Sequence, residues 1–275
     1  MTGRAAESAP EVLSAPAAFE LTLPPHWRVI EFLSDLHLQA AEPATLAALA
    51  GYLRHTPADG IFILGDLVEV WVGDDAAGPG SFEARCGDLL KEATARCAVF
   101  FLRGNRDFLI GSGFLNDGRV RDLPDPTAFT FSGQRWLVSH GDELCLDDTD
   151  YQRFRAQVRS AAWQQDFLAR PLAERQAVGR AMREASTARQ QEMASHADVD
   201  AGAARAWLTA AHATTLIHGH THRPAEHALG PDGQGHPLRR VVLSDWHLDG
   251  PAPRADVLRL DAGGLHRLSL AEVSP

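Results

Sequence analysis

The sequence predicts an α/β fold with mixed β-sheets flanked by helices and a helical insertion in the second half of the chain. Short apolar, β-branched or aromatic runs alternate with helix-like patterns from residue 28 onwards, which is typical of buried sheets covered by helices. Glycine-containing hairpin turns join some neighbouring strands, so the sheets are expected to be mixed and not purely parallel. Residues 140–213 carry no strand signal and predict the insertion.

The first half of the fold alternates strands and helices. Apolar runs predict strands at 29–33, 61–64 and 98–102, and the segments between them, 43–54 and 81–96, carry helical patterns. Strands that are apolar throughout are expected to be buried on both faces, because helices cover them.

The second half begins and ends with hairpins. One turns at Ser132-Gly133, and the other turns at Ala262-Gly263-Gly264. The predicted strands of this half are 129–131, 136–139, 214–217, 240–243, 257–260 and 265–270.

These elements predict a core with one interruption. Residues 28–148 and 213–275 are expected to form the core, and 149–212 a helical insertion that serves as a lid. Residues 1–27 are rich in Ala, Pro, Glu and Ser and show no signal-peptide pattern, so we expect a disordered or loosely attached tail. Helical stretches within the insertion are expected near 150–169, 171–194 and 200–212.

Composition excludes several classes of protein. No stretch approaches 18 consecutive apolar residues, so no transmembrane helix is expected. Cys86, Cys97 and Cys145 are too few and too scattered for a disulfide framework, which favours reduced thiols in a cytoplasmic protein. The net charge of −10 argues against nucleic acid as a partner, because phosphates need cations. No protein partner is inferred.

The arginines are distributed unevenly. Residues 150–190 hold eight arginines against four acidic residues, whereas the chain as a whole is acidic. This stretch is either a solvated helical face or a surface that binds anions, and charge alone does not decide between them.

Polar residues follow five of the predicted strands. In an open α/β sheet, sites form beyond the carboxyl ends of the strands. Each fragment alone is weak, but the ordered set predicts a binuclear metal site. The five fragments are Asp35-Leu36-His37, Gly65-Asp66, Gly104-Asn105-Arg106-Asp107, His140-Gly141-Asp142 and His218-Gly219-His220-Thr221-His222.

This ordered set resembles the calcineurin-like metallophosphoesterases. The resemblance implies a sandwich of two mixed sheets and two divalent metals that share one bridging carboxylate. Asp66 would bridge; Asp35, His37 and His222 would bind the first metal; and Asn105, His140 and His220 would bind the second. Imidazole, carboxylate and amide ligands suit Mn²⁺, Fe²⁺, Co²⁺ or Zn²⁺, and the resemblance favours Mn²⁺.

The neighbours of these ligands have expected roles of their own. Arg106 would contact phosphate oxygens and, with Asn105, act in catalysis; the alternative is an ion-paired surface arginine. Asp107, Asp142 and His218 are expected to orient ligand histidines. Ser244-Asp245-Trp246-His247 repeats the form of the first motif but is interpreted as structural.

Sequence outside the ligands is similar to the family of UDP-2,3-diacylglucosamine diphosphatases of lipid A biosynthesis. The similar segments extend from about residue 28 to 270 and include 65–75, 104–111, 151–155 and 218–225. The resemblance implies that water attacks the α-phosphorus and releases UMP and 2,3-diacylglucosamine 1-phosphate. It further implies an enzyme on the cytoplasmic face of the inner membrane, bound peripherally.

The same resemblance implies a set of substrate contacts. The chain departs from the family pattern at Gln190 and Met193, where Asn and Lys are common, and Met193 cannot replace a cation. The implied contacts are Asn105, Arg106, Asp148, Tyr151, Ser186, Gln190, Met193 and His220.

Apolar residues of the insertion recur at helical spacing. They either hold two acyl chains or pack the lid on the core. Two other functions stay open: a nucleotide or dinucleotide diphosphatase with a soluble substrate, and an inactive metal-stabilised scaffold. The apolar residues are Tyr151, Phe154, Val158, Trp163, Phe167, Leu168 and Leu172.

Overall fold

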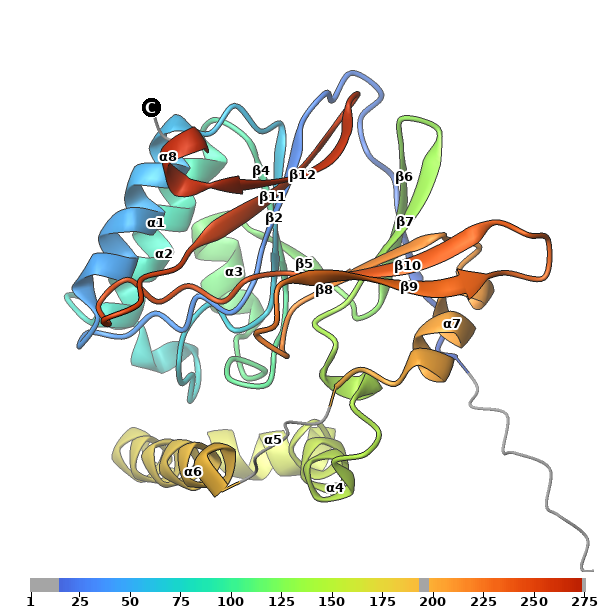
Figure 1. Ribbon diagram of the computed structural model, residues 1–275. Helices are drawn as coiled ribbons and strands as arrows, with labels where there is room; N and C mark the ends of the chain where they lie inside the picture. Colours follow the sequence, from blue (N-terminus) through green and yellow to red (C-terminus); the bar gives the residue numbers. More distant parts are fainter. Residues whose placement is uncertain (1–14, 193–197, 274–275) are drawn as a thin grey trace, which may run out of the picture.

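The computed structural model describes residues 15–192 and 198–273, with side chains left out for 185–192. Two six-stranded mixed sheets face each other, which confirms the predicted fold class (Figure 1). The first sheet has the order β12-β11-β2-β3-β4-β5, with β12 (Gly264–Ser269), β11 (Asp256–Asp261), β2 (Ile30–Leu33), β3 (Gly60–Leu64), β4 (Ala98–Leu102) and β5 (Arg121–Leu123). The second has the order β1-β6-β7-β8-β10-β9, with β1 (Phe19–Leu21), β6 (Thr127–Phe131), β7 (Gln134–Val138), β8 (Thr215–His218), β10 (Pro237–Val242) and β9 (Ala225–Pro231).

Alternation along the central strands builds two layers of core. Phe62 and Leu64 of β3 point toward the second sheet, while Ile61 and Ile63 point toward the helices, because successive side chains of a strand face opposite sides. Phe62 lies at the centre of the inner layer, with its ring 4.6 Å from that of Phe100 and 5.4 Å from that of Phe129. The central strands are therefore apolar on both faces because helices pack on their outer face and the second sheet packs on their inner face.

Helices cover the outer face of each sheet (Figure 1). The outer layer of the first sheet contains α1 (Pro43–His55), α2 (Phe82–Thr94), α3 (Ser112–Gly118) and α8 (Leu270–Val273). On the second sheet lies α7 (Ala201–Ala210), whose Ala204, Trp207 and Leu208 pack against the sheet. This helix was expected within the insertion, but its apolar face is buried on the core.

The insertion itself consists of three helices, α4 (Thr149–Val158), α5 (Ala161–Leu168) and α6 (Leu172–Glu192), which lie together below the sandwich in Figure 1. Asp148 and Ser160 accept hydrogen bonds from backbone N–H groups at the starts of α4 and α5. Several ion pairs tie the insertion to the core, among them Arg155 of α4 with Asp142 and Arg175 of α6 with Asp75.

Strands β1, β5 and β9 are absent from the sequence prediction. In β1, part of the segment expected as a tail pairs in parallel with β6. In β5 only three residues pair and two of them are exposed, so neither length nor alternation marks the strand. Among the described residues, no helix has both the length and the apolar character needed to cross a membrane.

Candidate metal centre

The predicted ligands lie on five loops that meet at one edge of the sandwich. Loops after β2, β3 and β4 belong to the first sheet, and loops after β7 and β8 belong to the second. Eight described non-glycine residues have positive φ, and five are predicted ligands: Asp35, His37, Asp66, His220 and His222, with φ between 45° and 68°. Side chains disfavour this region, and such strain often accompanies a functional constraint.

The first group of ligands surrounds Asp35. Nitrogen Nε2 of His37 and Nε2 of His222 are 3.2 Å apart, and Oδ1 of Asp35 is 3.3 Å from Nε2 of His222. Asp35 is fixed from behind, because Ser34 Oγ and the backbone N–H of His220 donate hydrogen bonds to its Oδ2. Three ligand atoms therefore converge on one point, within 4.8 Å of one another.

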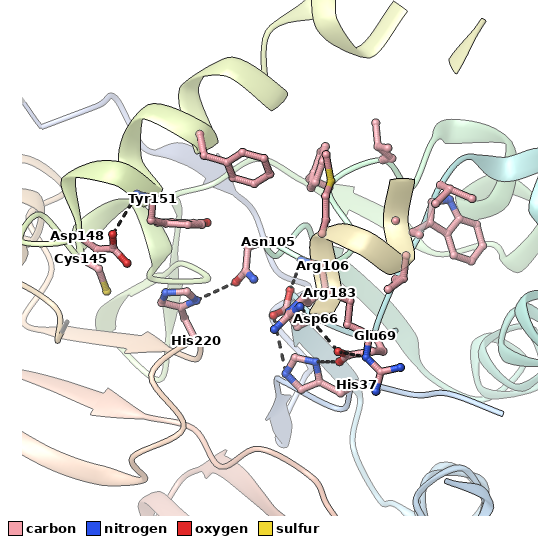
Figure 2. Close-up of a pocket in the computed structure, with 18 of the residues that line it drawn as sticks. His37, Asp66, Glu69, Asn105, Arg106, Cys145, Asp148, Tyr151, Arg183 and His220 are labelled. Atoms are coloured by element: carbon pink, nitrogen blue, oxygen red, sulfur yellow. Dashed lines mark hydrogen bonds and ion pairs between the residues drawn. The ribbon is translucent and has the colours of Figure 1, made fainter. Parts of the chain in front are cut away.

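The second group surrounds Asn105. Its Oδ1 lies 2.8 Å from Nε2 of His140 and 2.8 Å from Nδ1 of His220, and Figure 2 shows the second of these contacts. Nitrogen Nδ1 of His140 donates to the carbonyl oxygen of Leu64 at 2.9 Å, so in the neutral ring Nε2 holds a lone pair directed at another acceptor. A cation between these atoms relieves that repulsion, so the donor set fits a metal.

Asp66 lies between the two groups. Its Oδ2 is 3.9 Å from Nε2 of His37 and 3.7 Å from Nε2 of His140, while its Oδ1 accepts a hydrogen bond from the backbone N–H of Arg106. A buried carboxylate whose oxygen lies near histidines of both groups has the position expected of a bridging ligand.

Two carboxylates outside the motifs contact the first-group histidines. Oε2 of Glu69 is 2.7 Å from Nδ1 of His37, and Oδ2 of Asp245 is 3.7 Å from Nδ1 of His222. Such contacts fix the orientation of a ligand histidine. Asp245 belongs to the segment interpreted as structural, whose similarity to the first motif was the available signal. Glu69 belongs to the family-like segment 65–75, but the resemblance assigned it no role.

The residues expected to orient ligand histidines contact other groups. Asp107 accepts hydrogen bonds from the backbone N–H groups of Leu67 and Gly104, both at 2.7 Å, and so holds two loops together. Asp142 contacts the insertion. Nδ1 of His218 lies 2.9 Å from the carbonyl oxygen of Gly219, and its Nε2 lies 3.3 Å from Nη1 of Arg240 on β10.

The charges of this centre act strongly on the histidines. Burial lowers the pKa of His140, but the negative charges of Asp66, Asp142 and Asp35 outweigh burial and raise it to about 9. Burial and the charge of His140 lower the pKa of His220 to about 3. The metal-free centre therefore holds a proton on His140 at neutral pH.

Metal binding is expected to release this proton, because a protonated imidazole has no lone pair for a metal. Metal affinity should rise with pH and stop depending on His140 above about pH 9, where that ring is already neutral. Titration of the chelator-stripped protein with Mn²⁺ at pH 7 in buffers of different ionisation enthalpy measures the protons released. A proton count of zero at this pH would contradict ligation by His140.

The insertion covers this centre. The ring of Tyr151 stacks on His220 at 5.8 Å, and its hydroxyl donates to Asp142. Asp148 accepts from the backbone N–H of Tyr151 and lines the same cavity (Figure 2). Of the other predicted contacts, the side chains of Ser186 and Gln190 and the whole of Met193 lie outside the described residues.

A cavity of about 790 Å³ joins the centre to the insertion. One end is polar and includes His37, Asp66, Asn105, Arg106 and His220. The other end is apolar and aromatic, with contributions from both the core and the insertion. Its residues include Trp71, Phe108, Leu109, Phe154, Trp163, Phe167 and Met182.

A sandwich of two mixed sheets, with carboxylates, histidines and an asparagine on its loop edge, defines a metallophosphoesterase. The calcineurin-like phosphoesterase family model matches residues 29–224, and the chain belongs to this family. Family membership implies a hydrolase that depends on divalent metal ions.

Similar proteins indicate which kind of metallophosphoesterase the chain resembles. A protein of Aromatoleum aromaticum is 46% identical over 82% of this chain and 92% of its own length. Proteins of Stenotrophomonas maltophilia and Chromobacterium violaceum are 42% and 43% identical, over 85% and 88% of this chain and 95% and 98% of their own lengths. All three are named UDP-2,3-diacylglucosamine hydrolase.

Proposed function

We propose that the protein hydrolyses the diphosphate of UDP-2,3-diacylglucosamine to UMP and 2,3-diacylglucosamine 1-phosphate, a step of lipid A biosynthesis. The observation that carries this proposal is the cavity with two unlike ends, one polar and one apolar. A substrate with a diphosphate and two acyl chains has the same two chemical parts. The names of the relatives support the same substrate.

The proposed metals are two Mn²⁺ ions. Asp35, His37 and His222 would hold one, Asn105, His140 and His220 the other, and Asp66 both. When bound, such ions activate water and polarise phosphoryl oxygens. Carboxylate, imidazole and amide donors suit a transition metal better than Ca²⁺ or Mg²⁺.

The chain's own groups would bind and orient the diphosphate. The guanidinium of Arg106 lines the polar end, and its charge would stabilise the negative charge that builds on the attacked phosphate. Asn105 and His220 lie beside it, so a phosphate held there would contact residues from both sheets. Asp148 and Tyr151 border the same space on the insertion.

Helices α4, α5 and α6 would act as the lid, and its aromatic residues would hold acyl chains. Trp163 stacks on Phe167 with ring centroids 4.7 Å apart, the ring of Phe108 of the core lies 6.1 Å from that of Trp163, and all three residues line the cavity. Phe154 is 37% exposed and lies at the rim. Packing of the lid on the core and binding of acyl chains therefore use the same residues.

Replacing Trp163 or Phe154 with alanine is expected to raise KM for a long-chain substrate more than for a short-chain analogue. Each buried methylene contributes about 0.8 kcal/mol, so contact with a few methylenes amounts to a roughly ten- to hundredfold effect. KM measured for both substrates gives the comparison. Equal changes in KM for the two would argue against an acyl groove.

The protein would work at the cytoplasmic face of the inner membrane, bound peripherally. Phe154 and Leu168 are exposed on the lid, and Arg153 of α4 is largely exposed beside Phe154. Apolar and cationic groups together favour contact with an anionic lipid surface. No protein partner is part of this proposal.

Turnover of UDP-2,3-diacylglucosamine by chelator-stripped protein, with and without Mn²⁺, tests the proposed function. UMP and the lipid monophosphate should form only after Mn²⁺ is added. Cleavage of bis-nucleotides instead of this lipid would support the proposed metal centre but would indicate that the substrate is a soluble nucleotide. If neither substrate class is cleaved in the presence of metal, the result would favour the interpretation of the protein as an inactive scaffold.

A further inference from the structure

One face of α6 lies against a short segment of the core, residues 69–75. Arg175, Gly179 and Arg183 are four residues apart and therefore lie on the same face of the helix. Arg175 pairs with Asp75 at one end of the segment, and Nε of Arg183 lies 3.0 Å from Oε1 of Glu69 at the other.

Gly179 sets the distance between helix and segment. A Cβ atom at this position would lie 2.9 Å from side-chain carbons of both Val70 and Val72, closer than such atoms approach. Glycine therefore allows α6 to lie directly on the segment, and this close approach brings Arg183 to Glu69.

The carboxylate of Glu69 contacts the metal ligand His37 on one side and arginine side chains on the other. Its backbone N–H donates to the carbonyl oxygen of Leu38, which fixes it beside the first motif. Of its carboxylate oxygens, Oε2 lies 2.7 Å from Nδ1 of His37, and Oε1 lies 3.0 Å from Nε of Arg183 and 3.7 Å from Nη1 of Arg106 (Figure 2). The side chains of Glu69 and His37 are 13% and 15% exposed, so the contact between them is largely shielded from water, whereas Arg183 is 42% exposed.

We propose that Glu69 is a positioning residue that couples the lid helix α6 to the metal ligand His37. By accepting the proton of Nδ1, Glu69 leaves the lone pair of Nε2 directed into the centre. By holding Arg183, the same carboxylate fixes the lid. Metal binding restricts His37, and through Glu69 it restricts α6; this coupling is reciprocal. The inference rests on the proposed metal centre, but not on the proposed substrate.

The first measurement is Mn²⁺ affinity of the full-length, chelator-stripped protein without substrate. Glu69→Ala should weaken binding by roughly 10- to 100-fold, as is usual when the partner of a ligand histidine is removed. Glu69→Gln should recover most of this loss, because its amide oxygen can accept the same proton. Unchanged affinity in Glu69→Ala would overturn the proposal.

The second measurement is hydrogen exchange of the α6 backbone over residues 175–184. In the wild-type protein, Mn²⁺ should slow this exchange. In Arg183→Ala and in Glu69→Ala, exchange should no longer respond to Mn²⁺ at saturating concentration. Arg183→Ala with the same response as the wild-type protein would overturn the coupling.

Arg180→Ala provides the matched control. Arg180 is exposed, precedes Arg183 by three residues on α6 and makes no ion pair within the described part of the chain, so this variant should behave as the wild-type protein in both measurements. Wild-type protein that binds no Mn²⁺ would overturn the proposed metal centre together with this inference. Mn²⁺ binding without turnover of the lipid would refute the proposed substrate alone.

Discussion

Asp66→Ala is expected to abolish hydrolysis. The fall in kcat should reach roughly 10³-fold or more, because loss of one group that stabilises transition-state charge already costs up to about 10³-fold, and Asp66 would hold both metals. The reason is geometric. Oδ2 of Asp66 lies near Nε2 of both His37 and His140, so its removal affects both groups of ligands together. Metal analysis of the purified variant should show fewer than two ions per chain.

This loss should not come from unfolding. Burial and the nearby charge of Asp66 raise the pKa of Asp107 to about 7, so the metal-free protein carries two buried carboxylates at a cost. Removing Asp66 relieves that repulsion but also removes a charge that stabilises protonated His140, so the two effects oppose each other. Thermal unfolding should therefore show a Tm close to that of metal-free wild-type protein, and Mn²⁺ should raise the Tm of the wild-type protein more than that of the variant. A variant that retains both metals and full turnover would rule out the bridging role.

Arg106→Ala should lower kcat by about 10²- to 10³-fold while metal content stays unchanged. The two properties should separate because Arg106 contacts Asp66 through its backbone N–H, which alanine retains, and its guanidinium lies 3.7 Å from the oxygen of Glu69 that does not contact His37. Turnover and metal content of the same preparation give both values.

Arg106→Lys is the informative control for this prediction. An ammonium group keeps the charge but loses the planar, two-pronged donor geometry of a guanidinium, so it should restore little of the rate. Rates for Arg106→Ala close to the wild-type rate would favour the alternative interpretation, an arginine engaged only in ion pairing.

The sequence identified the candidate centre because its residues follow strands directly. Asp35, Asp66, Asn105, His140 and His220 each stand one to three residues beyond an apolar run, so strand order alone brings them to one edge. Buried strands such as β3 were equally clear, since both of their faces are apolar.

What the sequence did not predict depends on segments that meet only in the folded chain. Glu69 acquires its contacts from Leu38 and from α6, and Asp245 meets His222 across the loop edge; neither approach leaves a local pattern. Helix α7 has the same helical periodicity as the insertion, and only packing shows that its apolar face belongs to the second sheet. Strand β1 is too short to show alternation.

The five loops of the centre come from both sheets, and this has a consequence for the whole sandwich. Asp35, Asp66 and Asn105 follow strands of one sheet, while His140 and His220 follow strands of the other. Bound ions would therefore act as cross-links between the halves of the fold, closing loops of up to roughly two hundred residues in the unfolded chain. Occupancy of the centre would then determine how stably the two sheets are held together. Loss of the metals would therefore increase the susceptibility of the protein to proteolysis as well as abolish its activity.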